Sequence, residues 1–146
     1  MKNDLHHRMM VTQSRFYRAI THKTRKKGLK PGQPQVLEFL LENDGCTQKE
    51  IGRGCVLDKS TVTGLLFRMA ETGLLVREEG EADRRESRIR LTARGKELAH
   101  EVKAICHSVD EKAWTGVPAG EREAFLRVLV QIGRNLAETD EPGEEV

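Results

Sequence analysis

The segment between Thr47 and Gly73 contains two helix starts in close succession, and this spacing limits the possible folds more than any other feature of the chain. Thr47 and Glu50 match the capping box, in which an N-cap hydroxyl and a carboxylate three residues later each accept a hydrogen bond from the other residue's backbone N–H. Asp58 is a second good N-cap, because its carboxylate can accept from the free N–H groups of a first helical turn. Two helices separated by so short a turn predict a helix-turn-helix.

The second of these helices is predicted over residues 59–72. Its apolar side chains follow the i, i+3, i+4, i+7 spacing of a stripe that faces a core, namely Val62, Leu65, Leu66 and Met69. Gly73 stands where a glycine is expected just beyond a helix C-terminus. The face opposite the stripe is mostly polar or small, with Phe67 as its one large apolar residue.

After Gly73 the hydrophobic period changes from that of a helix to that of a strand. Residues 74–77 and 88–91 predict two short strands, and in the second strand two apolar residues alternate with two arginines. The loop between them, about residues 79–86, is charged and contains a glycine, which indicates a two-stranded hairpin. Such a hairpin is unstable alone, so it must pack on the helices.

The remaining periodic segments predict helices over residues 5–29, 33–43 and 93–115, with a last helix that begins near Pro118. The order of elements predicts a mainly α fold with a small β-hairpin wing, a winged helix-turn-helix. The first and the last two helices carry apolar stripes beyond what a small winged helix can cover, which predicts a helical dimerisation region. We expect a single domain over residues 1–146. Its parts are a DNA-binding lobe at 33–92, dimerisation helices at 1–30 and 93–138, and a flexible tail at 139–146.

The composition fits a soluble protein, with 37% hydrophobic and 33% charged residues. No apolar run approaches the roughly 20 residues that span a bilayer, and the start of the chain lacks the apolar core of a signal peptide, so we expect a cytoplasmic protein without membrane contact. Residues 1–30 hold nine Lys or Arg and one acid. This excess indicates either an anionic partner or a solvated helix face.

The segment "TQKEIGRGCVLDKSTVTGLLFRMAETGLLVR", followed by "EADRRESRIRLTARGKEL", resembles the MarR family of bacterial transcriptional regulators. The resemblance covers about residues 33–98, and the helices on either side agree by pattern. It implies a homodimer that binds a pseudo-palindromic operator in double-stranded DNA. It also implies a repressor that a small-molecule effector releases. No cofactor or enzymatic activity is expected.

The helix-turn-helix places a set of candidate DNA contacts on the exposed face of the second helix and beside it: Gln48, Lys59, Ser60, Thr61, Thr63, Gly64, Phe67 and Arg68. At the wing, the resemblance implies that Arg85, and with it Arg84, reaches the minor groove while Asp83 orients an arginine. Gly64 and Phe67 depart from the family, whose members often carry Arg and Asp there. The alternative is that these are ordinary surface residues.

The resemblance places an effector between the dimerisation helices and the DNA-binding lobe. His7, Met10 and Ser14 share one face of the first helix and are candidates to line that site. The alternative for Met10 is a place in the core, because methionine on an amphipathic helix usually packs there.

The cysteines and histidines allow further hypotheses. Cys46 and Cys55 fall at apolar positions and are expected to be buried. Cys106 next to His107 could be a redox sensor or a nucleophile site, although adjacent helical residues point about 100° apart. His107 and Glu111 could form half of a metal site, but no metal-ligand spacing is complete and we expect no metal. A redox- or metal-responsive regulator and a winged helix that binds proteins instead of DNA therefore remain alternatives.

Overall fold

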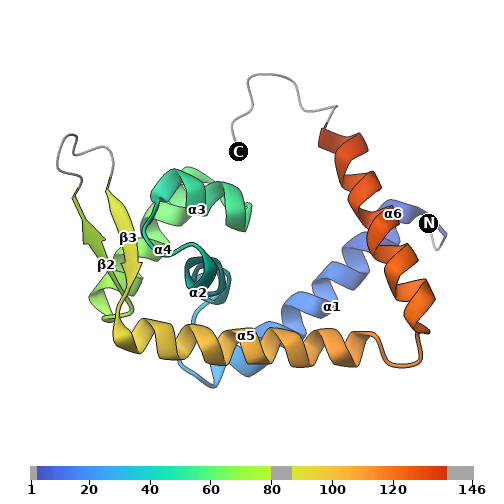
Figure 1. Cartoon of the computed structure of the whole chain (residues 1–146), viewed down its shortest axis with the longest axis horizontal. Helices are drawn as coiled ribbons and strands as arrows, with labels where there is room; N and C mark the ends of the chain where they lie inside the picture. The colour runs from blue at the N-terminus through green and yellow to red at the C-terminus, as the bar shows by residue number, and fades with distance from the viewer. Residues whose placement is uncertain (1–2, 80–86, 138–146) are drawn as a thin grey trace.

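The computed structural model describes residues 3–79 and 87–137. Its elements, in chain order, are α1 (Leu5–Arg25), α2 (Gln33–Glu42), β1 (Cys46–Thr47), α3 (Gln48–Cys55), α4 (Lys59–Glu71), β2 (Leu75–Glu78), β3 (Arg88–Leu91), α5 (Ala93–Ala113) and α6 (Ala119–Ala137). In Figure 1, α5 runs along the bottom of the molecule, with the strands, α3 and α4 near its start and α6 rising from its other end. The predicted fold class, mainly α with a winged helix-turn-helix, is confirmed.

The two predicted helix starts are formed by the predicted bonds. The Thr47 hydroxyl accepts from the Glu50 N–H at 3.2 Å, and the Glu50 carboxylate accepts from the Thr47 N–H at 2.8 Å, which completes the capping box. The Asp58 carboxylate accepts from the Thr61 N–H at 2.8 Å and so begins α4. Both caps satisfy backbone donors that have no partner inside the helix.

The end of α1 differs from the prediction, because the helix stops at Arg25 and not at residue 29. Gly28 adopts a left-handed φ of 79°, and the Leu29 N–H donates to the Thr24 carbonyl at 3.3 Å. This Schellman arrangement turns the chain and buries Leu29 in the core. The prediction took the end of the helix from Gly28 and Pro31, whereas the Schellman turn uses Gly28 as a residue beyond the helix, so the predicted end lay too far along the chain.

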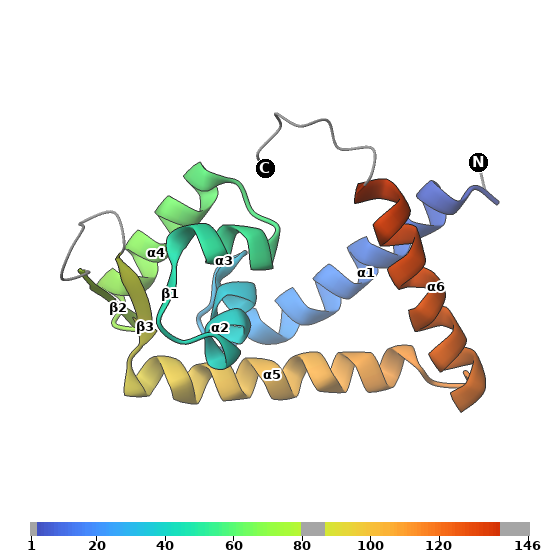
Figure 2. The same ribbon diagram turned by 45° about the horizontal axis from the view of Figure 1, so that its top comes forward.

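The sheet has one more strand than the predicted hairpin. Its order is β1-β3-β2 and all pairs are antiparallel, with Leu75 opposite Leu91 and Cys46 opposite Ile89. β1 is two residues long, which is too short to show any alternation in the sequence. Figure 2 shows it beside β3, where it joins the start of α3 to the wing.

The core lies inside the lobe formed by α2, α3, α4, the sheet and the first half of α5. The alternation predicted for β3 is confirmed: Ile89 and Leu91 are buried, and Arg88 and Arg90 are exposed. The largest fully buried side chains of the described chain come from all of these elements and include Leu37, Leu40, Ile51, Leu66, Met69 and Val102. This shared core fixes the exposed side of α4 relative to the wing.

Two glycines allow helices to pack closely within the lobe. A Cβ atom on Gly54 of α3 would overlap the ring of Phe39 on α2. A Cβ atom on Gly95 of α5 would overlap the backbone carbonyl of Leu74, just before β2. Each glycine lowers helix propensity by about 1 kcal/mol relative to alanine, and the close packing explains why a side chain is excluded there.

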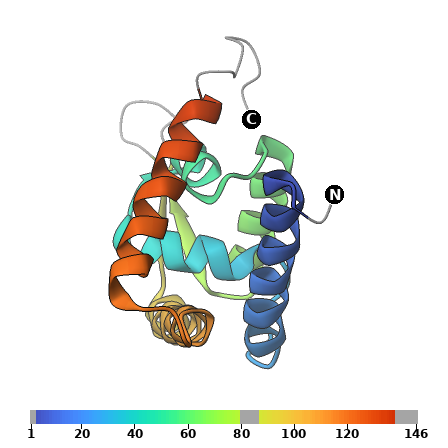
Figure 3. The ribbon, with the colours of Figure 1, turned by 90° about the vertical axis from the view of Figure 1, so that its right-hand side faces the viewer.

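Outside the lobe, α1 and α6 are largely exposed. α6 contains no buried residue, and the one buried residue of α1 is Thr24. Figure 3 shows α1 and α6 as separate helices on the two sides of α5, which is seen nearly end-on. None of the helices in residues 3–79 and 87–137 has the length and apolar character needed to cross a membrane.

Candidate nucleic-acid interface

The start of α4 is organised around the carboxylate of Asp58. It accepts hydrogen bonds from the Thr61 N–H, the Ser60 hydroxyl and the Thr61 hydroxyl, each at 2.8 Å. These bonds, the one from the Thr61 N–H first, lower the pKa of Asp58 to about 2, so the carboxylate is ionised at neutral pH. Because both hydroxyl protons point to Asp58, the two hydroxyls present lone pairs outward and can accept from base amino groups.

A chain of hydrogen bonds joins β2, α3 and α4 beside this cap. The Arg77 guanidinium donates to the Gln48 Oε1 atom at 3.2 Å, and the Gln48 Nε2 atom donates to the Thr63 hydroxyl at 2.7 Å. Thr63 in turn donates to the Lys59 carbonyl at 2.9 Å. The structure therefore brings together Gln48 and Thr63, two of the predicted DNA contacts, and holds both in fixed orientations.

Arg77 was not among the predicted site residues. It lies two residues after the buried Leu75 in β2, so the strand alternation places both on the side of the sheet that faces the helices. The Arg77 side chain is long enough to extend from this face of β2, past the core, to Gln48 of α3. The predicted strand over residues 74–77 places Leu75 and Arg77 on one face, and this placement was the signal that could have identified Arg77.

The middle of α4 presents an open, partly apolar surface. The side chain of Phe67 is 63% exposed. A Cβ atom on Gly64 would meet nothing closer than the Arg68 guanidinium at 3.6 Å, so a partner can approach the helix backbone closely there. Lys59, Ser60, Thr61 and Thr63 are also exposed or at the exposed side. All predicted contacts of α4 thus lie on one accessible side.

The predicted wing contacts Arg84 and Arg85, and the orienting residue Asp83, lie outside the described residues. On the strands that lead to them, Arg90 Nε donates to the Glu78 carboxylate at 2.7 Å, and this pairing raises the pKa of Arg90. Arg88 is exposed, with one long bond of 3.5 Å to the Gly45 carbonyl. Acids on the wing therefore orient at least one arginine.

The three residues predicted to contact an effector lie in the first half of α1. His7 is half-buried, whereas Met10 and Ser14 are exposed, so Met10 is not a core residue of the monomer. None of the three lines the cavity of about 750 Å³ along α6, or the cavity of about 300 Å³ between the start of α2, the end of α4 and the start of α5. Their role remains a prediction.

The cysteines have no reactive environment. Cys46 is buried, as expected. Cys55, also expected to be buried, is half-buried and packs against the core, and Cys106 is half-buried too. Burial, and then the Glu38 carboxylate, raises the pKa of Cys106 to about 12, and burial raises that of Cys55 to about 11. The thiolate is the reactive form, so the raised pKa values keep these two thiols in the less reactive protonated form at neutral pH. In the part of the chain that the structure describes, no three His, Cys, Asp or Glu side chains are grouped to hold a metal.

Comparison with known proteins identifies relatives of this lobe. A family model described as MarR family matches residues 27–86. HosA, a transcriptional regulator of Escherichia coli, is 31% identical over 97 residues, which cover 66% of this chain and 72% of HosA. TtmR, a helix-turn-helix regulator of Methylorubrum extorquens, is 36% identical over 101 residues, or 69% of this chain. The match spans about half of TtmR, 51% of its length.

The fold extends this likeness to the flanking helices. The crystal structure of the transcriptional regulator PA3341 superposes with a TM-score of 0.79 at 29% identity, covering 89% of this chain and 96% of that one. These relatives are transcriptional regulators and not enzymes.

Proposed function

This chain belongs to the MarR family of transcriptional regulators, and from this premise we propose that it is a homodimeric repressor that binds a pseudo-palindromic operator until a small molecule releases it. The observation that carries the proposal is the exposed side of α4, where polar groups are held in place by Asp58 and Gln48 while Phe67 has no packing partner in the core. A rigid helix of this kind suits the major groove of DNA.

Each group on this side has a role in the proposed complex. Phe67 offers an apolar surface to thymine methyl groups, and the lone pairs of Ser60 and Thr61 accept from base amino groups. Lys59 and Arg68 form no ion pair among the described residues, so their charges are available to phosphates. At the wing, we propose that Arg84 and Arg85 enter the minor groove with Asp83 as their orienting partner.

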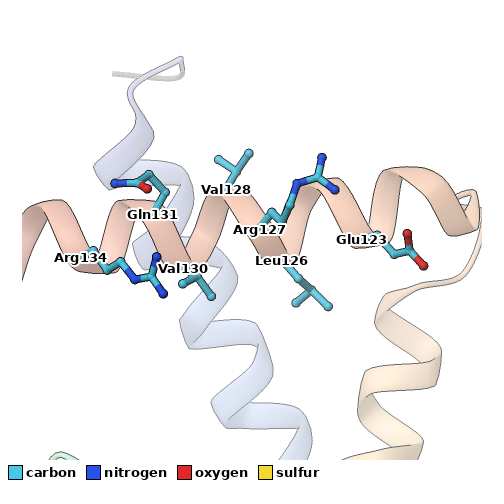
Figure 4. Close-up of a pocket in the computed structure, with 7 residues that line it drawn as sticks. All are labelled: Glu123, Leu126, Arg127, Val128, Val130, Gln131 and Arg134. Atoms are coloured by element: carbon cyan, nitrogen blue, oxygen red, sulfur yellow. The ribbon is translucent and has the colours of Figure 1, made fainter.

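The exposed apolar surface of α6 supports the homodimer. Four large apolar side chains of α6 are between 50% and 55% exposed, namely Phe125, Leu126, Val128 and Val130. Figure 4 shows Leu126 and Val130 on one side of α6, along an open cavity of about 750 Å³ that α6 residues line. Helices in proteins gain most of their stability from the packing of an apolar face. Because α6 has no buried residue in the single chain, a second copy of the chain would supply this packing.

In this proposal residues 33–92 form the DNA-binding lobe, and residues 1–30 and 93–138 form the dimerisation region. α5 belongs to both, since its first half packs on the lobe core and its second half leads to α6. A continuous helix between the two parts supports a fixed distance between the two α4 helices of a dimer.

Sedimentation and DNA binding test the proposal together. The wild type should sediment as a dimer at micromolar concentration and shift DNA in a salt-dependent manner. Leu126→Asp should weaken the dimer and the DNA complex in parallel, because two recognition helices must be linked. Val76→Asp, which alters an exposed apolar side chain of β2, should remain dimeric. A folded wild-type monomer, or a protein that shifts no DNA at low salt, would contradict the proposal.

A further inference from the structure

The turn between α5 and α6 brings together three side chains, Trp114, Arg122 and Phe125, which we call the elbow cluster. The Arg122 guanidinium carbon lies 5.8 Å from the centroid of the Trp114 ring, which is a cation–π distance. The Phe125 ring meets the Trp114 ring edge to face, with centroids 5.9 Å apart and planes at 80°. The cluster therefore joins the residue that caps α5 to the first two turns of α6.

Hydrogen bonds from Arg122 hold the polar side of the same cluster. Its Nε atom donates to the Val117 carbonyl at 2.8 Å, and its Nη2 atom donates to the Trp114 carbonyl at 3.2 Å. Trp114 is the C-cap of α5, where the last carbonyls have no partner inside the helix and the helix dipole favours a positive charge. One half-buried arginine of α6 thus binds two carbonyls of the turn and the aromatic ring between the helices.

The other contacts of α6 do not determine its direction. Gly116, in the turn, adopts a φ of 79°, and a Cβ atom there would meet nothing within 4 Å, so no other element packs on the turn at that point. α6 has no buried residue, and within residues 3–79 and 87–137 it does not pack along any other helix or strand. Figure 1 shows α6 leaving the end of α5 that is far from the strands. The elbow cluster is therefore the contact that sets the angle between α5 and α6.

This angle has a consequence for the proposed homodimer, on which the inference rests. α5 runs without a break from the core of the lobe to the turn, and α6 carries the exposed apolar side chains that are proposed to meet a second copy. The angle between the two helices then decides how far apart, and at what rotation, the two α4 helices of a dimer are held. Two such helices bind half-sites whose spacing matches their own.

We propose that Arg122 is a positioning residue for operator recognition, which determines the half-site spacing that the dimer accepts. It acts through the direction of α6 and does not touch DNA. Without the guanidinium, α6 takes several directions relative to α5, and the dimer binds half-sites at several spacings. Readout of bases by α4 is unchanged, because the lobe has its own core.

The elbow cluster can be measured without DNA, because Trp114 is the only tryptophan of the chain. Arg122→Met keeps an unbranched side chain and removes the guanidinium. The time-resolved fluorescence anisotropy of the full-length protein should show a larger local motion of Trp114 in Arg122→Met than in the wild type. Lys112→Met removes a positive charge from an exposed side chain in the last turn of α5 and should leave this motion unchanged. Equal Trp114 motion in the wild type and Arg122→Met would overturn the role of the cluster.

Operators that differ only in half-site spacing test the positioning role. Each inserted base pair rotates one half-site by about 35° and moves it by about 3.4 Å. The wild type should bind the operator of its selected spacing at least about tenfold more tightly than operators with one base pair inserted or deleted. In Arg122→Met this ratio should fall to about threefold or less, because the dimer adapts in place of the DNA. Lys112→Met should keep the wild-type ratio, and all three proteins should select the same bases within a half-site.

A second variant approaches the cluster from α5. Trp114→Leu removes the ring that Arg122 and Phe125 contact, and it should lower the spacing ratio as Arg122→Met does. The double variant should lose no more discrimination than either single variant, because the two residues act through one contact. Additive losses would mean that the two side chains act separately and would overturn the cluster as a unit.

The outcomes separate the inference from the proposed function. A dimeric wild type that discriminates between spacings, with equal discrimination in Arg122→Met, would overturn the inference alone. A monomeric Arg122→Met would also overturn it, because the residue would then act in association and not in spacing. A wild type that forms no dimer, shifts no DNA or binds all spacings equally would contradict the proposed function and the inference together.

Discussion

The side-chain amide of Gln48 donates to the Thr63 hydroxyl at 2.7 Å and accepts from Arg77 at 3.2 Å, so one residue of α3 fixes groups on both α4 and the wing. Gln48→Leu removes both bonds at nearly constant size. We expect DNA affinity to fall by about 1 kcal/mol, roughly fivefold, because Thr63 and Arg77 lose their fixed positions. Fluorescence anisotropy with labelled operator DNA measures this loss.

Gln35→Leu is the matched control for Gln48→Leu. Gln35 is an exposed glutamine of α2 without a side-chain hydrogen bond among the described residues. Its replacement should leave DNA affinity unchanged. If both variants bind DNA like the wild type, the bonds of Gln48 do not organise the interface.

The exposure of Phe67 predicts a contact with thymine methyl groups. Phe67→Ala should leave the free energy of unfolding nearly unchanged, because the ring is outside the core. Replacing a contacted thymidine in the operator by deoxyuridine removes one methyl group and should weaken wild-type binding by about 0.8 kcal/mol, roughly fourfold. The same replacement should not affect Phe67→Ala. Equal losses for both proteins at every thymidine would mean that the ring does not touch a methyl group.

The low pKa of Asp58 predicts a specific dependence of stability on pH. The pKa of Asp58 in the folded state is about 2, below the ordinary value of 3.8. The ionised carboxylate therefore stabilises the fold above about pH 4, and this contribution is lost as the pH falls through about 2. Urea unfolding of the wild type and of Asp58→Asn measures the contribution by difference, because other carboxylates are common to both. The gap between their midpoints should be widest at neutral pH and narrow between pH 4 and pH 2. A gap that is constant with pH would contradict the charged cap.

Two helical glycines should respond in opposite directions to alanine. Gly95→Ala should lower the free energy of unfolding by about 1–3 kcal/mol or more, because the new Cβ atom overlaps the Leu74 carbonyl. Gly64→Ala should raise it by about 0.5–1 kcal/mol, since a Cβ atom there meets only the Arg68 guanidinium, at the ordinary contact distance of 3.6 Å, and alanine favours the helix. Thermal or chemical unfolding of the free protein checks both. Equal effects of the two changes would contradict the packing of α5 on the chain before β2.

Much of the lobe could be predicted from local chemistry. The capping box at Thr47, the cap at Asp58 and the alternation of Ile89 and Leu91 each depend on residues close in sequence, and each is present in the structure. The strand β1 was missed because two residues carry no period. The end of α1 was misplaced because Gly28 was taken as the place where the helix stops, whereas it lies in the left-handed turn beyond the helix.

The candidate site was predictable as a helix face but not as a network. The helical period identifies which side of α4 is exposed, and the structure agrees for Phe67. The bonds from Arg77 to Gln48 and from Gln48 to Thr63 join three elements, and no local pattern specifies such a join.

Selection of bound sequences from random DNA tests the central claim most directly, because it requires DNA binding, a two-fold dimer and base readout at once. The full-length wild type should enrich a pseudo-palindrome whose half-site centres lie about one helical turn, roughly 10 bp, apart. Selection with Phe67→Ala should lose preference for thymine within the half-sites while retaining their spacing. Enrichment of a single asymmetric motif, of half-sites on opposite faces of the DNA, or of no sequence at all would contradict a dimer that reads DNA with α4.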